Sequence, residues 1–251
     1  MLTIDGVRKS FGNLVAVDDL DLTVPAGSIH AFLGPNGAGK TTTLKMCTGL
    51  LRPDQGRIAI AGHDIVADGV EARRHIAYVP DEPYLYDRLS GREFLQFTAH
   101  IYGLSTTVFK QRFDEVVACF NLDGFLDQLA ADYSHGMRQR VVLAAAFLHR
   151  PDLIIVDEPL VGLDPKHIRI LLDRLRQHAA DGGAVLMSTH TLSAVEDLAD
   201  RLSVIRHGQQ VFNGTLAELK ADRGLEERFL SITEDGASPP APNEADSSAR
   251  W

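Results

Sequence analysis

Cysteine is scarce in this sequence of 251 residues, with Cys47 and Cys119 the only two. Neither lies in a C-x-x-C or similar spacing, and none of the ten histidines forms an H-E-x-x-H pair. These absences argue against a structural zinc cluster and against a zinc-dependent hydrolase. We expect both cysteines to be small core residues.

An excess of positive charge and a long apolar run are also lacking. Lys and Arg total 25 against 34 Asp and Glu, which gives a formal net charge of −9. Because a phosphate backbone requires a basic surface, we expect no nucleic-acid partner. No apolar run approaches the ~18 residues of a membrane span, and Met1–Asp5 does not begin a signal peptide. We therefore expect a cytosolic chain.

A glycine-rich segment, Gly34-Pro35-Asn36-Gly37-Ala38-Gly39-Lys40-Thr41, follows a short apolar strand and fits the phosphate-loop pattern G-x-x-x-x-G-K-[ST]. Glycines let backbone N–H groups approach phosphate oxygens, which also favour the start of a helix. Lys40 is expected to reach the β and γ phosphates, and the Thr41 hydroxyl to bind Mg²⁺. The predicted nucleotide-binding residues of this segment are Gly34, Pro35, Asn36, Gly37, Ala38, Gly39, Lys40, Thr41 and Thr42.

Two acids, Asp157 and Glu158, follow the apolar run Leu153–Val156. The carboxyl edge of a parallel sheet places ligand-binding groups, so Asp157 is expected to hold Mg²⁺. Glu158 would polarise the water that attacks the γ-phosphate. Taken alone, such a pair is equally compatible with a structural role, but together with a phosphate loop it indicates nucleotide hydrolysis.

The apolar pattern predicts an α/β core with a parallel sheet. Alternation indicates a strand at 20–24 and a buried strand at 29–33, followed by a helix at 41–50 and a strand around 58–60. Later, Asp164-Pro165 resembles an N-cap with proline at the first helical position, Gly182-Gly183 ends that helix, and 184–187 forms another buried strand. Strand and helix in alternation imply parallel pairing.

A helical lobe is expected between the two parts of the core. Ser90 and Glu93 form a capping-box pattern, an apolar stripe at 108–120 indicates a second helix, and 122–129 a short third one. The predicted domain is 1–233, with the core at 1–83 and 150–220, the lobe at about 84–149 and an extension at 221–233. The Ser-, Pro- and acid-rich segment 234–251 is expected to be a disordered tail.

The segment Tyr133–Gln139 resembles the signature loop of the ATP-binding-cassette family, the nucleotide-binding subunits of ABC transporters. The resemblance extends to about Lys220. It implies a P-loop NTPase core of the RecA type with a parallel sheet, an N-terminal antiparallel β subdomain and an inserted α-helical signature subdomain. It also implies ATP and Mg²⁺ as cofactors, with ATP held between two subunits. Ser134 and Gly136 would then contact the γ-phosphate of a second copy.

Three further residues are assigned roles through this resemblance. Asp164 belongs to a segment similar to the dimer-contacting loop, and His190 resembles the catalytic switch histidine that contacts the γ-phosphate. Phe11 resembles the aromatic residue that stacks on adenine. Without the resemblance, Ser134 would be an ordinary helix cap, His190 a strand-end side chain and Phe11 an equally good core residue.

The sequence departs from the family pattern at Asp81, where glutamine is usual. A carboxylate can bind Mg²⁺ but cannot donate a hydrogen bond, and it adds negative charge near a triphosphate. The signature segment has His135 in place of the common glycine and Met137 in place of the common glutamine. The combination is similar to exporter-type bacterial members of the family.

These observations predict an ATPase that drives an ABC transporter, with a transmembrane permease and a second ATP-binding subunit, expected to be an identical copy, as partners. It would lie at the cytoplasmic face of a membrane as a peripheral subunit. Two alternatives stay open: a soluble ABC ATPase acting in translation or DNA repair, and a regulatory module that barely hydrolyses ATP. The transported substrate and its direction are not encoded in these motifs.

Overall fold

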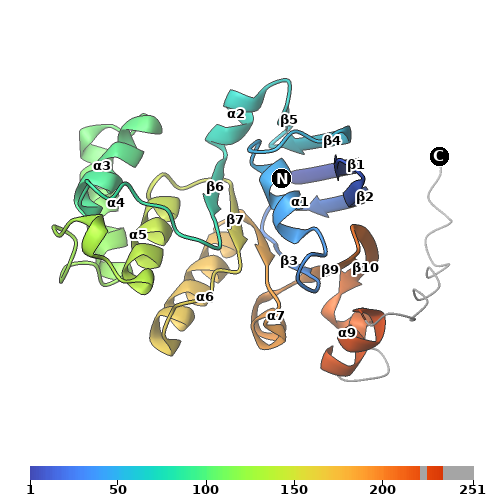
Figure 1. Cartoon of the computed structure of the whole chain (residues 1–251). Coiled ribbons are helices and arrows are strands. Elements are labelled where there is room, and N and C mark those ends of the chain that lie inside the picture. Colours follow the sequence, from blue (N-terminus) through green and yellow to red (C-terminus); the bar gives the residue numbers. More distant parts are fainter. Residues whose placement is uncertain (221–224, 234–251) are drawn as a thin grey trace.

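The computed structural model describes residues 1–220 and 225–233 and contains two β-sheets with helices between and around them (Figure 1). The predicted tail, 234–251, lies outside the described residues, as do residues 221–224 of the predicted extension. Within the described part, no helix is long and apolar enough to cross a membrane.

The larger sheet has six strands in the order β10-β9-β3-β8-β7-β6. Five of them are parallel, and only β10 runs antiparallel to its neighbour β9. Successive side chains of a strand point to opposite faces, and here one face enters one hydrophobic cluster while the opposite face enters two others. The strands are β3 (Ile29–Leu33), β6 (Ile76–Val79), β7 (Leu153–Asp157), β8 (Ala184–Ser188), β9 (Arg201–Arg206) and β10 (Gln209–Thr215).

The smaller sheet is antiparallel and confirms the expected N-terminal β subdomain. Its strand order is β2-β1-β4-β5, formed by β1 (Leu2–Phe11), β2 (Leu14–Val24), β4 (Gln55–Ile60) and β5 (His63–Asp64). Helix α1 (Lys40–Cys47) shares one hydrophobic cluster with both sheets, and Cys47 is fully buried in it as expected. The short helix α2 (Gly69–Arg74) follows the smaller sheet. Helix α1 ends earlier than predicted because Gly49 has a φ of +72°.

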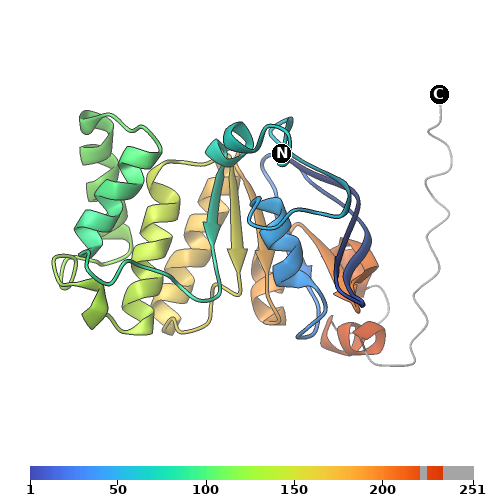
Figure 2. The same ribbon diagram turned by 45° about the horizontal axis from the view of Figure 1, so that its top comes forward.

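Helices α3 (Gly91–Ile101), α4 (Thr106–Cys119) and α5 (His135–Leu148) form a group on the side of the larger sheet opposite the antiparallel sheet, seen in green in both Figure 1 and Figure 2. Their apolar side chains share one cluster with the larger sheet. The predicted capping box is present, since Ser90 and Glu93 each accept a hydrogen bond from the other's backbone N–H. Cys119 is partly buried against the same cluster.

The predicted third helix at 122–129 is wrong. This segment forms turns that lead into the 3₁₀ helix η1 (Ala130–Asp132). Asn121 has a φ of +53°, Asp123 and Gly124 are poor helix formers, and Leu129 pairs with Ser90 in an isolated β-bridge. The apolar residues of this segment do face the core, because Leu122, Phe125 and Leu126 are buried, but they belong to a packed turn and not to a helix.

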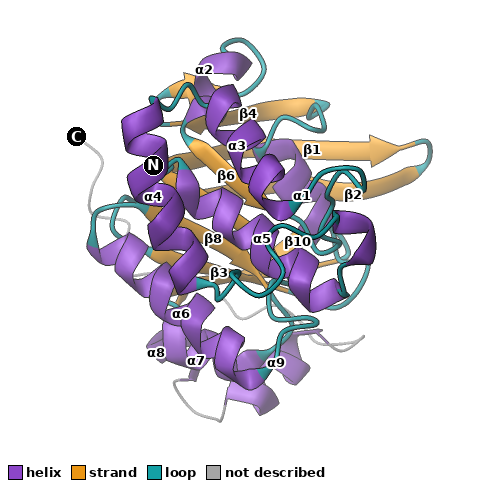
Figure 3. Cartoon of the chain, turned by 90° about the vertical axis from the view of Figure 1, so that its left-hand side faces the viewer, coloured by secondary structure: helices purple, strands orange, loops and turns teal. Residues whose placement is uncertain are grey.

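The remaining helices complete the fold. They are α6 (Pro165–Ala180), α7 (Leu192–Leu198), α8 (Leu216–Lys220) and α9 (Leu225–Thr233). As predicted, Asp164 caps α6, accepting a hydrogen bond of 3.0 Å from the backbone N–H of His167, with Pro165 at the first helical position. Figure 3 shows α4, α5 and α6 in front of the strands of the larger sheet. The helices cover the faces of the sheet, and the loops that carry the predicted site lie at the carboxyl edge of its parallel strands.

Candidate functional site: a nucleotide cavity at the carboxyl edge of the sheet

A cavity of about 510 Å³ lies where the phosphate loop leaves β3. Eleven of the predicted site residues line it, together with residues at the start of β2 and in the β9–β10 turn. The predicted residues are Phe11, Pro35, Asn36, Gly37, Ala38, Gly39, Lys40, Thr41, Thr42, Asp81 and Glu158. This volume falls within the range of small-molecule sites.

The phosphate loop has a shape that only glycine permits at two positions. A side chain on Gly34 would place its Cβ 2.3 Å from the carbonyl oxygen of Ile205. Gly39 has a φ of +110°, and a Cβ there would lie 2.4 Å from the carbonyl oxygen of Ala16. The backbone N–H of Gly208 donates to the carbonyl of Ala38 at 3.0 Å, so the β9–β10 turn also fixes the loop. The glycines therefore allow close backbone packing as well as access to phosphate.

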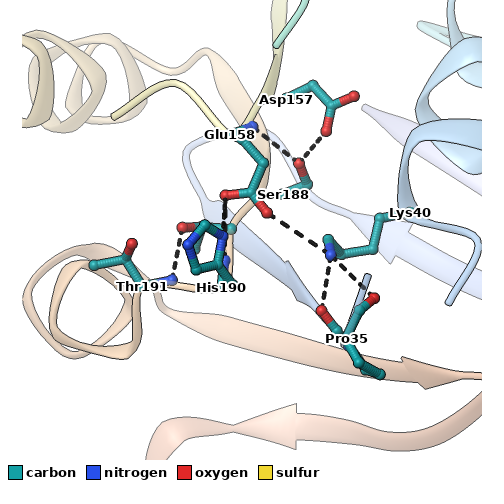
Figure 4. Close-up of polar contacts among 9 residues, drawn as sticks. Pro35, Lys40, Asp157, Glu158, Ser188, His190 and Thr191 are labelled. Carbon is teal, nitrogen blue, oxygen red and sulfur yellow. Dashed lines mark hydrogen bonds and ion pairs between the residues drawn. The ribbon is translucent and has the colours of Figure 1, made fainter. Parts of the chain in front are cut away.

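Lys40 opens α1 and folds its side chain back over the loop. Its Nζ donates to the carbonyl of Gly34 at 2.7 Å and to that of Pro35 at 3.3 Å (Figure 4). The same ammonium lies 3.7 Å from Oε1 of Glu158. Only 7% of the lysine side chain is exposed, so its charge is held close to the carboxylate in a partly desolvated setting. Such a cation is placed to bind phosphate oxygens.

Asp157 and Ser188 meet across the neighbouring strands β7 and β8. Ser188 Oγ donates to Oδ1 of Asp157 at 2.5 Å and accepts a hydrogen bond of 3.1 Å from the backbone N–H of Glu158. Among the described residues, Oδ2 of Asp157 has no hydrogen-bond partner although it is buried. A buried carboxylate oxygen without a donor is a fit for a bound cation.

Glu158 is held by its backbone and by its side chain. Its φ of +46° is unusual for a residue other than glycine, and such strain is often found at functional sites. Its Oε2 accepts hydrogen bonds from Nδ1 of His190 at 2.9 Å and from the backbone N–H of His190 at 3.3 Å (Figure 4). Because a carboxylate only accepts, Nδ1 carries the proton in this contact. The structure thus places the two predicted catalytic residues together.

Asp81 follows β6 and faces the same group of acids. Partial burial raises the pKa of its carboxyl, and the negative charges of Asp157, Glu158 and Glu82 raise it further. The charge of His135 acts in the opposite direction. Asp81 is nevertheless open to solvent and lines the cavity, where its oxygens can act as cation ligands.

Mg²⁺ fits these residues when a nucleotide supplies the remaining ligands. Mg²⁺ takes oxygen ligands and is usually held by one or two carboxylates plus phosphates and waters. Asp157, Asp81 and the exposed hydroxyl-bearing Thr41 offer this donor set. Within the described part of the chain, no three His, Cys, Asp or Glu side chains form a cluster that would hold a metal ion by themselves.

Phe11 ends β1 at the mouth of the cavity. Half of the side chain is exposed, and Nζ of Lys9 lies 5.7 Å from the ring centroid. An exposed aromatic face beside a phosphate loop is suited to stacking on a base, and the alternative of a core residue does not hold for Phe11.

Ser134, Gly136 and Asp164 do not line the cavity. Ser134 is the exposed N-cap of α5 and accepts a hydrogen bond of 3.3 Å from the backbone N–H of Met137. A Cβ on Gly136 would lie 3.0 Å from the carbonyl oxygen of Gly162, so the start of α5 packs against the loop that precedes α6. Ser134 and Asp164 are exposed and Gly136 is partly buried, so the α5 N-terminus lies at the surface and outside this cavity.

Several positioning residues were missed by the sequence analysis. Ser188 holds both acids, and Ala16 and Gly208 pack against the phosphate loop. His207, in the same turn as Gly208, also lines the cavity. The His-Gly pair between two alternating apolar segments is a pattern that predicts a hairpin. The contact of that turn with the phosphate loop, far away in the sequence, could not be predicted from the pattern.

Comparison with known proteins agrees with this geometry. The family model described as "ABC transporter" matches residues 17–161. A daunorubicin resistance ATP-binding protein, DrrA3 of Streptomyces coeruleorubidus, is 37% identical over 235 residues, which cover 94% of this chain and 74% of that protein. A Nod factor export ATP-binding protein I of Rhizobium sp. (strain N33) is 35% identical over 214 residues, covering 85% and 70%. A solved structure of an ATP-binding subunit of an ABC transporter superposes with a TM-score of 0.89 at 33% identity, covering 93% of this chain and 100% of that one. The chain belongs to the ABC transporter family.

Proposed function

We propose that this chain is the ATP-hydrolysing motor subunit of an exporter, working at the cytoplasmic face of a membrane through a separate membrane-spanning permease. The observation that carries the proposal is the position of Glu158 between Lys40 and His190, beside the phosphate loop. The export role is supported by the names of the two relatives, one of drug resistance and one of Nod factor export.

Binding of ATP would use the phosphate-loop amides and Lys40, with Phe11 against the adenine. Mg²⁺, when bound, would neutralise the developing charge on the phosphates, and we assign Thr41, Asp157 and Asp81 to its coordination. Glu158 would orient the attacking water and accept its proton. His190 keeps the Glu158 carboxylate in place through Nδ1.

A second copy of the chain would complete the site. The α5 N-terminus, with the Ser134 hydroxyl and the Gly136 amide, is suited to a phosphate but does not line the cavity of its own chain. We therefore propose that two copies clamp ATP, with Asp164 in the contact between them. Opening of this dimer after hydrolysis would move the permease.

Replacement of Glu158 by glutamine tests the assignment. Glu158→Gln keeps the size of the side chain but removes the base, so we expect ATP turnover to fall by about 100-fold or more while ATP binding remains. The variant should form a dimer at saturating Mg·ATP, seen by size-exclusion chromatography with light scattering. A variant that hydrolyses ATP as fast as the parent contradicts the role of Glu158, and a variant that stays monomeric contradicts the shared site.

One observation favours a second candidate, a nucleotide-dependent regulatory module with little hydrolysis. Asp81 places a third carboxylate beside Asp157 and Glu158, and this negative charge opposes binding of a triphosphate. Measured turnover of the parent protein separates the two candidates. Co-purification with a multi-span membrane protein would support the motor role over a soluble ATPase.

A further inference from the structure

A second cavity, of about 560 Å³, lies at the amino edge of the larger sheet, away from the nucleotide cavity. Its walls come from α4, from the connection between α5 and β7, from α6 and from the turn between α6 and β8. Three arginines from different elements line it: Arg112 of α4, Arg150 before β7 and Arg174 of α6. None of them belongs to the nucleotide site.

Three arginines and three acids, Glu115, Asp152 and Asp181, line the cavity, but among the described residues only Arg150 forms an ion pair with one of these acids. Arg150 pairs with Glu115 at 3.1 Å. Arg112 makes a long hydrogen bond of 3.4 Å to the carbonyl of Leu148, and Arg174 has no carboxylate within ion-pair distance in the described part of the chain. Arg112 and Arg174 therefore form no ion pair within the described residues, although the charge of Glu115 acts on Arg112 from a greater distance.

The acids at the cavity are occupied by other partners. Oδ2 of Asp152 contacts Nδ1 of His75 at 2.5 Å, and Oδ1 of Asp181 accepts a hydrogen bond of 2.8 Å from Gln177. Glu115 is used by Arg150. Each acid thus has a partner, although that of Asp181 is a neutral amide, while Arg112, Arg174 and the buried Nε2 of His178 keep unused hydrogen-bonding capacity.

The surroundings of the arginines support the same interpretation. Burial lowers the pKa of the Arg112 guanidinium and the nearby positive charge of Arg150 lowers it further, while the negative charge of Glu115 raises it. The guanidinium carbon of Arg174 lies 5.8 Å from the ring centroid of Phe147, which orients it, while its buried Nε has no hydrogen-bond partner in the described part of the chain. Like charges held together at a partly desolvated cavity are stabilised by an anion.

We propose that this cavity binds a small phosphorylated anion, gripped by Arg112 from α4 and Arg174 from α6. A phosphate group with two charges and three acceptor oxygens can accept from guanidinium groups on two walls, whereas a carboxylate presents one planar pair of oxygens. The cavity has room for such a ligand. Phe147 is only 8% exposed, so it orients Arg174 and offers no face for stacking a base.

A bound anion would connect two parts of the molecule. Arg112 belongs to the helical group of α3, α4 and α5, and Arg174 to α6, which packs against the larger sheet. The bridge would oppose movement of one against the other. Binding of an anion at the amino edge of the sheet would thus regulate ATP hydrolysis at the carboxyl edge.

The experiment uses inorganic pyrophosphate as the probe, with the full chain carrying Lys40→Ala so that the phosphate loop no longer competes. Isothermal titration calorimetry without Mg²⁺ should show one remaining site. Adding Arg174→Gln, or separately Arg112→Gln, should weaken binding by about tenfold or more, because each removes a charge-assisted hydrogen bond. Arg176→Gln is the matched control, since Arg176 lies on the same helix but contacts Asp173 and the carbonyl of Asp197.

Retained binding in both Arg112→Gln and Arg174→Gln overturns the proposal, as does the absence of binding in the Lys40→Ala chain at millimolar pyrophosphate. An equal loss with Arg176→Gln shows a diffuse charge effect and overturns it too. Citrate binding as tightly as pyrophosphate would refute the preference for phosphate. Circular dichroism of each variant checks folding, and Arg174→Lys, which keeps the charge, should bind more weakly than the parent but more tightly than Arg174→Gln.

Discussion

Nδ1 of His190 donates a hydrogen bond to Oε2 of Glu158 across 2.9 Å. The other oxygen of the same carboxylate, Oε1, faces Nζ of Lys40 at 3.7 Å. One oxygen is therefore fixed by an imidazole and the other lies toward the phosphate-binding cation. Since Glu158 is itself on a strained backbone, its side chain depends on these contacts for its direction.

Loss of the imidazole should leave Glu158 in place but poorly oriented. We expect His190→Ala to lower kcat for ATP by about 10- to 100-fold with a smaller change in KM, because positioning of the base is affected more than binding. A steady-state ATPase assay measures this. His190→Asn can still donate a hydrogen bond and should retain more activity than His190→Ala. Equal activity of the parent and His190→Ala would show that the contact has no catalytic consequence.

Ser188 connects the two acids, since its hydroxyl donates to Asp157 and accepts from the backbone N–H of Glu158. Ser188→Ala should raise the Mg²⁺ concentration needed for half-maximal ATPase activity and lower kcat by about tenfold, because the buried Oδ1 of Asp157 loses its donor. The backbone N–H of Glu158 loses one of two acceptors and keeps the carbonyl oxygen of residue 188 at 3.2 Å. Ser188→Thr keeps the hydroxyl and is the comparison, although its extra methyl group must fit in a fully buried position. A metal dependence unchanged in Ser188→Ala would contradict the role.

Asp81 adds a negative charge beside the two site acids. Asp81→Gln removes this charge and introduces a donor, so we expect ATP to bind about fivefold more tightly, corresponding to roughly 1 kcal/mol at an intermediate dielectric constant. Equilibrium binding of a fluorescent ATP analogue measures the change. Asp81→Glu keeps the charge and should not tighten binding. If Asp81→Gln weakens ATP binding, Asp81 strengthens that binding as a Mg²⁺ ligand by more than its charge weakens it through repulsion of the triphosphate.

The sequence predicted the parts of the site that lie in short continuous motifs. The phosphate loop, Asp157 and Glu158 could be recognised because each follows an apolar strand at a fixed spacing. Ser188 could not, since its importance arises only when β7 and β8 pair in register and bring it beside Asp157. The turn at 122–129 was misread for a related reason: its buried leucines and phenylalanine follow helical spacing, while the pairing of Leu129 with Ser90 is a tertiary contact.

Gly162, in the loop before α6, lies against the ring of His135. It has a φ of +78°, and a Cβ there would lie 2.1 Å from Cδ2 of His135. Gly162→Ala should therefore destabilise the chain by about 1–3 kcal/mol and shift the start of α5. The measurement is urea unfolding combined with ATPase activity.

The matched background for this change is His135→Gly, which removes the ring. In this background the added Cβ no longer meets the ring, so Gly162→Ala should lower the free energy of unfolding less than it does in the parent. The penalty for the positive φ remains. Additive effects in the double-mutant cycle would mean that the ring and the loop are not coupled.

Two histidines, the buried His30 and the partly buried His149, should make stability depend on pH. Burial lowers the pKa of His30 to about 4 and that of His149 to about 4, from an ordinary value near 6.5. Between these values the unfolded chain binds more protons than the folded one, so stability is lost as pH falls from about 6.5 toward about 4. Each histidine contributes a slope of up to about 1.4 kcal/mol per pH unit in this window.

Urea unfolding at several pH values between 5 and 6.5 measures that slope above the range in which most carboxylates titrate. His149→Gln keeps a donor for the carbonyl of Ile76, which Nε2 of His149 contacts at 3.2 Å, and should flatten the slope whatever its effect on absolute stability. The exposed His100, replaced by glutamine in the same way, is the control and should leave the slope unchanged. A group that titrates equally in the folded and unfolded chains contributes nothing to the slope. If His149→Gln and the parent lose stability in parallel as pH falls, the imidazole of His149 takes up its proton equally in both states and the argument from burial fails.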